Sequence, residues 1–107
     1  MHKAAEFSAA FNARRVLRGS YFYLHYGSAD QAVARLGLVI AKKLAVRAVQ
    51  RNLLKRLARE AFRQVRGELP AFDLVLRLAR APGLRMDIPA RRLWRDDIEQ
   101  LLARLPR

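Results

Sequence analysis

Apolar residues recur at helical spacing between positions 46 and 61, with polar residues between them. At about 100° per residue, one side of a helix carries the apolar members of this stretch: Val46, Val49, Leu53, Leu57 and Ala61. The opposite side carries a polar row within an arc of roughly 100°: Asn52, Lys55, Arg56, Arg59, Arg63 and Arg66. The pattern therefore predicts an amphipathic helix that ends near Arg66, before Gly67 and Pro70, with its apolar face in a core.

Three shorter stretches have the pattern of β-strands. Residues 21–26 are rich in aromatic side chains, residues 35–40 are mostly apolar, and residues 72–78 alternate between apolar and other side chains. A turn is expected at residues 27–30. In the first strand, alternation separates two sets of side chains: Phe22, Leu24 and Tyr26 toward the core, and Tyr21, Tyr23 and His25 on the other face.

Two further helices complete the predicted order. In residues 3–12, Phe7 and Phe11 lie about one helical turn apart. Asp87 is placed to cap a final helix, with Pro89 near its start. The inner stripe of that helix is predicted to contain Leu93, Trp94, Ile98, Leu101 and Leu102. The order helix, two strands, helix, strand, helix indicates an α+β fold with a small sheet, and 107 residues indicate a single domain over 1–107.

The chain is strongly basic, with a formal net charge of +13. The amphipathic helix contains only one acid, Glu60, whereas solvated helices usually mix Glu with Lys at i,i+4 spacing. A solvated helix face is the simplest alternative, but so many cations without acids repel one another. We therefore predict a polyanionic partner, with nucleic acid as the first candidate. Most of the cations are Arg, whose planar fork binds phosphate in a bidentate manner.

The aromatic residues before the basic helix have two possible roles. Each of them alone is readily explained as part of a core. If the helix carrying Phe7 and Phe11 lies over the face that carries Tyr21, Tyr23 and His25, a cleft lined with rings results. Rings beside cations form a surface on which unstacked bases can stack.

The sequence predicts no catalytic residue and no metal site. It has no cysteine, and neither His2 nor His25 has a carboxylate or nucleophile at a catalytic spacing. The single acidic cluster, Asp96, Asp97 and Glu99, faces arginines of the same helix, so we expect it to be salt-paired and solvated. No glycine-rich phosphate loop or zinc spacing is present. Without an apolar run of membrane-spanning length or a signal peptide core, the expected location is the cytoplasm.

A long motif runs from the turn after the second strand through the basic helix. It reads Lys42-Lys43, then Ala48-Val49-x-Arg51-Asn52, then Lys55-Arg56-Leu57-x-Arg59-Glu60-Ala61-Phe62-Arg63. Its surroundings include a Gly-Leu-x-Val/Ile strand before the lysine pair, the segment Glu68-Leu69-Pro70-Ala71-x-Asp73 and the upstream pair Phe7 and Phe11. In these features, and over essentially its whole length, the chain resembles the bacterial ribonuclease P protein subunit.

The resemblance implies a role in removing the 5′ leader of precursor tRNA. Catalysis would reside in a large RNA that holds the Mg²⁺ ions, and the protein would need no protein partner and no membrane. Binding to the catalytic RNA is implied for Arg47, Arg51, Asn52, Lys55, Arg56, Arg59 and Arg63. Binding to the single-stranded leader is implied for Phe7, Phe11, Tyr23, His25, Lys42 and Lys43.

The resemblance also adds to the expected fold. It implies a four-stranded sheet, with the extra strand near residues 15–17, and a left-handed crossover around the basic helix. That handedness is opposite to the one that βαβ units normally adopt. The chain departs from the family's Arg-Asn-Arg hallmark because Leu53 follows Asn52. Position 53 falls beside the apolar arc, so we expect leucine to pack there without deforming the helix.

Two other classes of protein are also compatible with the sequence. A different basic RNA-binding protein, such as a ribosomal protein, would share the charge but would need no leader cleft. An amphipathic basic helix could also lie on an acidic membrane surface, although the flanking strands argue for a globular core. Dependence of precursor tRNA affinity on leader length distinguishes the first alternative, and binding to liposomes distinguishes the second.

Overall fold

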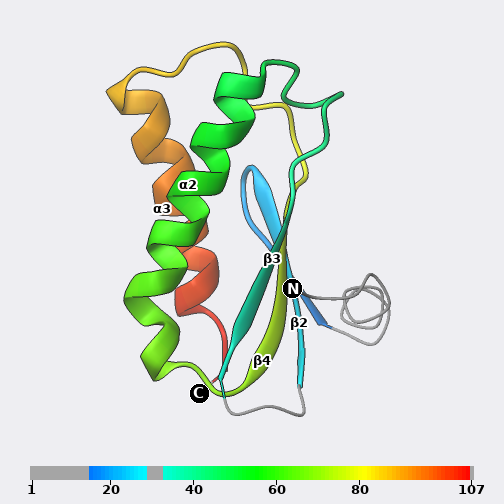
Figure 1. Cartoon of the computed structure of the whole chain (residues 1–107), viewed down its shortest axis with the longest axis vertical. Coiled ribbons are helices and arrows are strands. Elements are labelled where there is room, and N and C mark those ends of the chain that lie inside the picture. Colours follow the sequence, from blue (N-terminus) through cyan, green and yellow to red (C-terminus); the bar gives the residue numbers. More distant parts are fainter. Residues whose placement is uncertain (1–14, 29–32, 107) are drawn as a thin grey trace.

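The computed structural model describes residues 15–28 and 33–106 (Figure 1). The helix expected over residues 3–12, with Phe7 and Phe11, therefore lies outside the described residues. The described chain forms four strands and two long helices in the order expected for an α+β domain. The bounds are β1 Arg15–Arg18, β2 Phe22–Ser28, β3 Arg35–Val39, α2 Ala48–Val65, the short 3₁₀ helix η1 Arg66–Glu68, β4 Phe72–Leu78 and α3 Ile88–Ala103.

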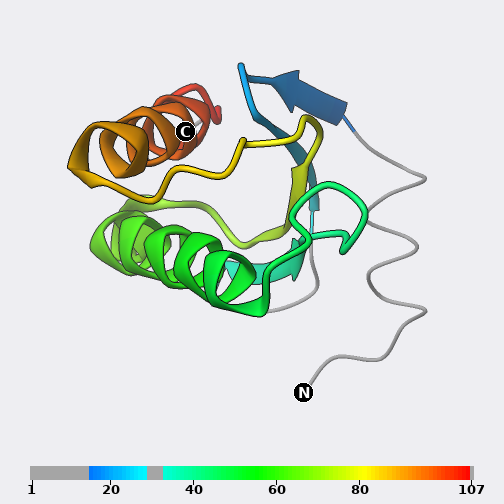
Figure 2. The same cartoon turned by 90° about the horizontal axis from the view of Figure 1, so that it is seen from above.

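The strands form one mixed sheet in the order β1-β2-β4-β3. Strand β2 pairs antiparallel with β1 and β4, whereas β3 and β4 are parallel. Parallel neighbours need a crossover, which α2 supplies. Seen from above in Figure 2, β3 and β4 rise toward the viewer, and the path from β3 through α2 to β4 is left-handed. The four-stranded sheet, the extra strand near residues 15–17 and the unusual crossover are thus all confirmed.

Helices α2 and α3 lie side by side over one face of the sheet (Figure 2). The strand faces toward them follow the predicted alternation. Phe22 and Leu24 of β2 are completely buried, and the β4 residues paired with them, Leu78 and Leu76, are also buried. Trp94 of α3 is buried in the same core. The opposite face of the sheet, called here the outer face, is left without either helix.

The buried face of α2 differs from the predicted stripe. Its buried residues are Gln50, Leu53, Leu54, Ala58 and Ala61. Val46 and Val49, which were predicted to be inside, are 66% and 59% exposed. Helical spacing does not apply to Val46, because it precedes the first residue of α2. A polar residue, Gln50, enters the core in place of Val49, because its side-chain amide donates a 2.7 Å hydrogen bond to the carbonyl of Gly83.

The buried face of α2 bears on two expectations from the sequence: the packing of Leu53 and the membrane-surface alternative. Leu53 is only 6% exposed, so leucine at this departure from the family hallmark packs into the core as expected. The membrane alternative requires an apolar face of α2 that a bilayer could receive. Most of that face is buried against the sheet and α3, and α2 presents its polar row outside, with Val49 as the exposed apolar residue near its start.

Helix α3 begins where the sequence predicted. The carboxylate of Asp87 accepts a 3.1 Å hydrogen bond from the backbone N–H of Ala90. A hydrogen bond from Arg85 is the main cause that lowers the pKa of Asp87. The cap is therefore fully ionised at neutral pH, and its contribution is lost as pH falls through the lowered pKa. Leu93 was wrongly placed in the inner stripe, because it is 57% exposed at the edge of that face.

Asp97 was predicted to be solvated, and this prediction was wrong. Its carboxylate is buried and accepts three backbone hydrogen bonds from the bend between β1 and β2: from Ser20 at 2.7 Å, Tyr21 at 2.9 Å and Phe22 at 3.0 Å. Gly19 completes the arrangement, since an added Cβ would lie 2.5 Å from Asp97 Oδ1. The carboxylate thus satisfies amides that no strand pairs. The salt-paired prediction is confirmed only for Glu99, which binds Arg95 at 2.9 Å.

Candidate nucleic-acid interface

The polar row predicted on α2 is present as a continuous surface. Its residues lie opposite the buried face of the helix, and Asn52, Arg56, Arg59 and Arg63 are all exposed. Together with Glu60, these four line a shallow hollow of about 370 Å³. We call this surface the basic row. It has the cations and the concave shape that suit the phosphate backbone of a nucleic acid.

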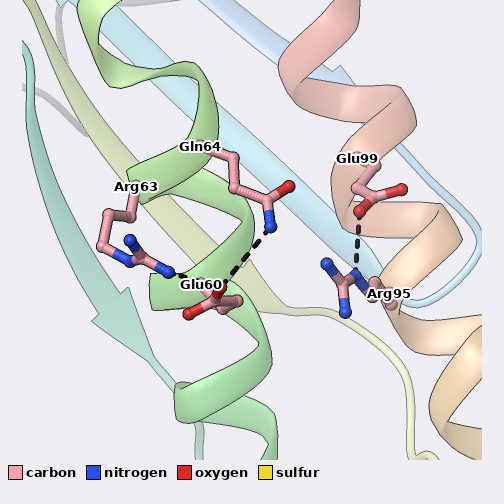
Figure 3. Close-up of polar contacts among 5 residues, drawn as sticks. All are labelled: Glu60, Arg63, Gln64, Arg95 and Glu99. Atoms are coloured by element: carbon pink, nitrogen blue, oxygen red, sulfur yellow. Dashed lines mark hydrogen bonds and ion pairs between the residues drawn. The ribbon is translucent and has the colours of Figure 1, made fainter.

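One acid, Glu60, lies within the basic row and holds one of its cations, Arg63. Glu60 accepts a 2.6 Å hydrogen bond from Arg63 and a 3.4 Å contact from Gln64 (Figure 3). Arg63 is the main cause that lowers the pKa of Glu60, first by its hydrogen bond and then by its charge, and Arg95 of α3 adds a smaller electrostatic effect in the same direction. The influence of Arg95, which is itself held by Glu99, means that α3 contributes positive charge beside the basic row.

Glu60→Gln is expected to strengthen binding to polyanions while reducing selectivity. The change removes a negative charge from the hollow and releases Arg63. We expect the affinity for an unrelated RNA duplex to rise a few-fold. The slope of log affinity against log salt should become steeper by the amount that roughly one additional phosphate contact contributes. Fluorescence titration at several salt concentrations measures both quantities.

Asp96→Asn is the matched control for this change, because it removes one acid from an exposed position of α3 outside the hollow. Net charge alone would make the two variants equal. Equal gains in affinity and slope would therefore show that Glu60 has no special role within the basic row.

The segment before α2 is tied down by Arg51. Its Nη1 donates hydrogen bonds of 2.9 Å to the carbonyls of Ala45 and Val46. The turn just before these residues, at 41–45, carries Lys42 and Lys43 as exposed side chains. The resemblance implied that Arg51 binds RNA, and this geometry gives it a second, structural role. It fixes the approach to α2, where Arg47 occupies the N-cap position without a side-chain cap.

The outer face of β2 carries the two predicted leader residues of this strand, Tyr23 and His25, side by side. Both are half-buried. Arg77 of β4 is paired with Tyr23 in the sheet, and its Nε donates to His25 Nε2 at 3.4 Å. Arg18 of β1 is paired with Tyr23 from the other side. Sequence reasoning missed both arginines. The alternation of residues 72–78 places Arg77 on this face, but only the strand pairing brings it to Tyr23.

The predicted site residues thus fall on two surfaces. The basic row lies on α2, over one side of the sheet, and Tyr23 and His25 lie on the other side. The turn that carries Lys42 and Lys43 projects toward the outer face at the end of the sheet where β3 ends (Figures 1 and 2). The described residues therefore bring the lysine pair and the β2 residues to one side of the molecule. The roles of Phe7 and Phe11 remain predictions, because both residues lie outside the described part of the chain.

The described residues contain neither a candidate metal cluster nor a candidate membrane span. Over residues 15–28 and 33–106, His, Asp and Glu side chains do not gather into any group of three or more that could hold a metal ion. Within these same ranges, neither long helix combines the length and the apolar character that a membrane crossing needs.

Comparison with known proteins gives a consistent result along the whole chain. The family model described as Ribonuclease P matches residues 1–106. The chain is 52% identical over 106 residues to a ribonuclease P protein component of Azoarcus sp. (strain BH72), covering 99% of this chain and 85% of the relative. It is 44% identical over 104 residues to that of Aromatoleum aromaticum, covering 97% and 84%. The solved RNase P protein from Thermotoga maritima matches with a TM-score of 0.81 at 28% identity, over 100% of this chain and 97% of that one.

Proposed function

The chain belongs to the ribonuclease P protein family, and from this premise we propose that it binds the catalytic RNA through α2 and the 5′ leader of precursor tRNA on the opposite side of the sheet. As a ribonuclease P protein component, it works with the RNA of a tRNA-processing ribonuclease. The family assignment also decides against a ribosomal-type protein. The finer proposal assigns the two partners to the two surfaces of the molecule.

The basic row carries the first half of this proposal. Its cations project from a helix whose other face is held in the core, so the backbone positions from which they project are fixed before RNA binds. Such preorganisation reduces the entropy that binding costs. Arg56, Arg59 and Arg63 contact phosphates of the catalytic RNA, and Asn52 and Lys55 extend the contact along α2. Arg47 and Arg51 continue the surface at the start of the helix.

The outer face carries the second half. Tyr23 and His25 lie there with Arg18 and Arg77, and the turn with Lys42 and Lys43 projects to the same side. A surface that combines rings with cations suits single-stranded nucleic acid. The leader of precursor tRNA is the single-stranded segment next to the cleavage site. In this proposal Phe7 and Phe11 contact the same strand.

The proposal leaves the chemistry of cleavage to the RNA subunit. Mg²⁺ ions held by RNA phosphates would supply the activated water for phosphodiester hydrolysis. The protein's residues act by holding the leader and by neutralising phosphates where the RNA and the precursor tRNA meet. Their effect is to lower the Mg²⁺ concentration that the assembled enzyme needs. This work takes place in the cytoplasm.

Leader dependence tests the proposal. We compare the affinity of the assembled RNA–protein enzyme for precursor tRNA with a long leader and for the same tRNA without one. Each charge-assisted contact to the leader contributes about 1.5–3 kcal/mol to binding. Precursor tRNA with a long leader is therefore expected to bind at least about tenfold more tightly than the same tRNA without a leader. The RNA subunit without the protein should discriminate much less. Equal affinities for both substrates in the assembled enzyme would contradict the proposal for the outer face.

A further inference from the structure

Tyr23 lies between two guanidinium groups. The guanidinium carbon of Arg77 is 5.0 Å from the centre of the Tyr23 ring, and that of Arg18 is 5.6 Å away. Strand pairing explains this arrangement, because Arg18 and Arg77 are the residues directly opposite Tyr23 on β1 and β4. These two strands flank β2 on opposite sides, about 5 Å away on each side. The two cations therefore approach the ring from opposite directions.

This arrangement changes what the ring can do. A base stacks on an aromatic side chain by covering a face of the ring, and here arginines from both sides occupy the space beside Tyr23. Cation–π contacts of this kind are worth about 0.5–1 kcal/mol at exposed sites, enough to favour one position of each guanidinium. The ring thus serves better as a spacer that holds two cations than as a platform for a base.

We propose that Arg18, Tyr23 and Arg77 form a clamp that binds the phosphates of a single-stranded leader rather than its bases. The inference rests on the proposed function, because it takes the leader as the strand that crosses the outer face. In the clamp, Arg18 and Arg77 each offer their planar forks to a phosphate, and Tyr23 keeps them apart. Phosphates carry no sequence information, so the clamp accepts leaders of any sequence.

Other contacts keep the clamp in place. His25 Nε2 accepts a 3.4 Å hydrogen bond from Nε of Arg77, and this bond orients the guanidinium. The backbone carbonyl of Arg18 accepts a 3.0 Å hydrogen bond from Nη1 of Arg104, which ties β1 to the end of α3. Tyr23 and Arg77 are half-buried, and partial removal from water strengthens the attraction of the guanidinium for a phosphate.

The test separates phosphates from bases by changing one or the other in the leader. Precursor tRNAs carry a single neutral methylphosphonate linkage, or a single abasic nucleotide, at each leader position in turn. Binding is measured with the assembled RNA–protein enzyme. We expect at least one methylphosphonate to weaken binding about tenfold, the effect of losing one charge-assisted contact, whereas abasic nucleotides at the neighbouring positions leave it within about twofold.

Variants assign this effect to the clamp. With Arg77→Ala or Arg18→Ala, the affinity for the unmodified substrate should fall about tenfold, and a methylphosphonate at the linkage which that arginine holds should then cost nothing further. Arg77→Lys keeps the charge and should retain part of the sensitivity. Arg92→Ala is the matched control, because it removes an exposed arginine from α3, on the other side of the sheet. It should keep the full sensitivity. Melting temperatures show whether each variant is folded.

Three results would overturn the clamp. One is a full methylphosphonate effect at every sensitive linkage in both folded alanine variants. Another is the absence of any sensitive linkage in an enzyme that still prefers long leaders. The last is a loss from an abasic nucleotide that disappears in Tyr23→Leu, because this would show that a base stacks on the ring. If the unmodified enzyme has no preference for a leader at all, the proposed function itself fails, and that outcome differs from each of these three.

Discussion

Replacing Arg56 and Arg59 together by alanine is expected to weaken binding to ribonuclease P RNA by roughly a hundredfold, because each charge-assisted contact is worth about 1.5 kcal/mol or more. Both side chains are exposed on α2 and line the hollow of the basic row. Each lost phosphate contact should also reduce the slope of log affinity against log salt by about 0.7–0.9. The double variant should therefore lose between one and two units of slope. Titration at four or five salt concentrations measures both changes.

The stability of this variant should change little, since neither arginine contributes to the core. The control is Arg85→Ala with Arg92→Ala, which removes the same total charge from exposed positions outside the basic row. A general effect of net charge would make the two double variants equal. Wild-type affinity and slope in the Arg56 and Arg59 variant, with its folding intact, would show that the basic row does not bind the RNA.

Asp97→Ala is expected to be among the most destabilising single changes in α3. The carboxylate accepts three backbone hydrogen bonds from residues 20–22. Hydrogen bonds to a charged group contribute about 1.5–3 kcal/mol each, and buried donors left without a partner cost more than the bond itself. We expect a loss of about 3–5 kcal/mol in the free energy of unfolding, a large part of the about 5–15 kcal/mol of a typical domain. Urea denaturation followed by circular dichroism measures it.

Neighbouring positions give the controls for Asp97. Asp96→Asn changes an exposed acid on the same helix and should alter stability by less than about 0.5 kcal/mol. Gly19→Ala places a Cβ against the Asp97 carboxylate and should also destabilise, whereas the Cβ of Gly67→Ala meets no atom within 4 Å. If Asp97→Ala costs less than about 1 kcal/mol, the carboxylate does not hold the bend between β1 and β2.

Much of the fold could be predicted from the sequence because strand alternation and helix signals are local. The alternation of residues 21–26 gave the correct inner face of β2, and Asp87 marked the start of α3. The predicted apolar stripe on α2 was partly wrong because one buried position depends on a contact with a residue distant in the sequence. A polar side chain such as Gln50 can enter a core only when it finds a partner, and its partner is the distant carbonyl of Gly83. The spacing of apolar residues contains no sign of that contact.

The candidate site shows the same division. The cations of the basic row share one helix, so the helical period alone was enough to group them. The clamp required the pairing of three strands, because Arg18, Tyr23 and Arg77 are far apart in the sequence and meet only across the sheet. Asp97 was misjudged for a similar reason. Its acidic neighbours suggested a solvated helix face, whereas the three amides that bind it come from residues more than 70 positions away.

Cleavage of precursor tRNA by reconstituted enzyme tests the central proposal most directly. The purified protein is added to a bacterial ribonuclease P RNA at a Mg²⁺ concentration too low for the RNA alone, and the release of the 5′ leader is followed over time. We expect the RNA and protein together to cleave at the 5′ end of the mature tRNA, and the protein alone to cleave nothing. An RNA that stays inactive at low Mg²⁺ when saturated with folded protein would contradict the proposal. So would cleavage by the protein alone that persists when Mg²⁺ is chelated.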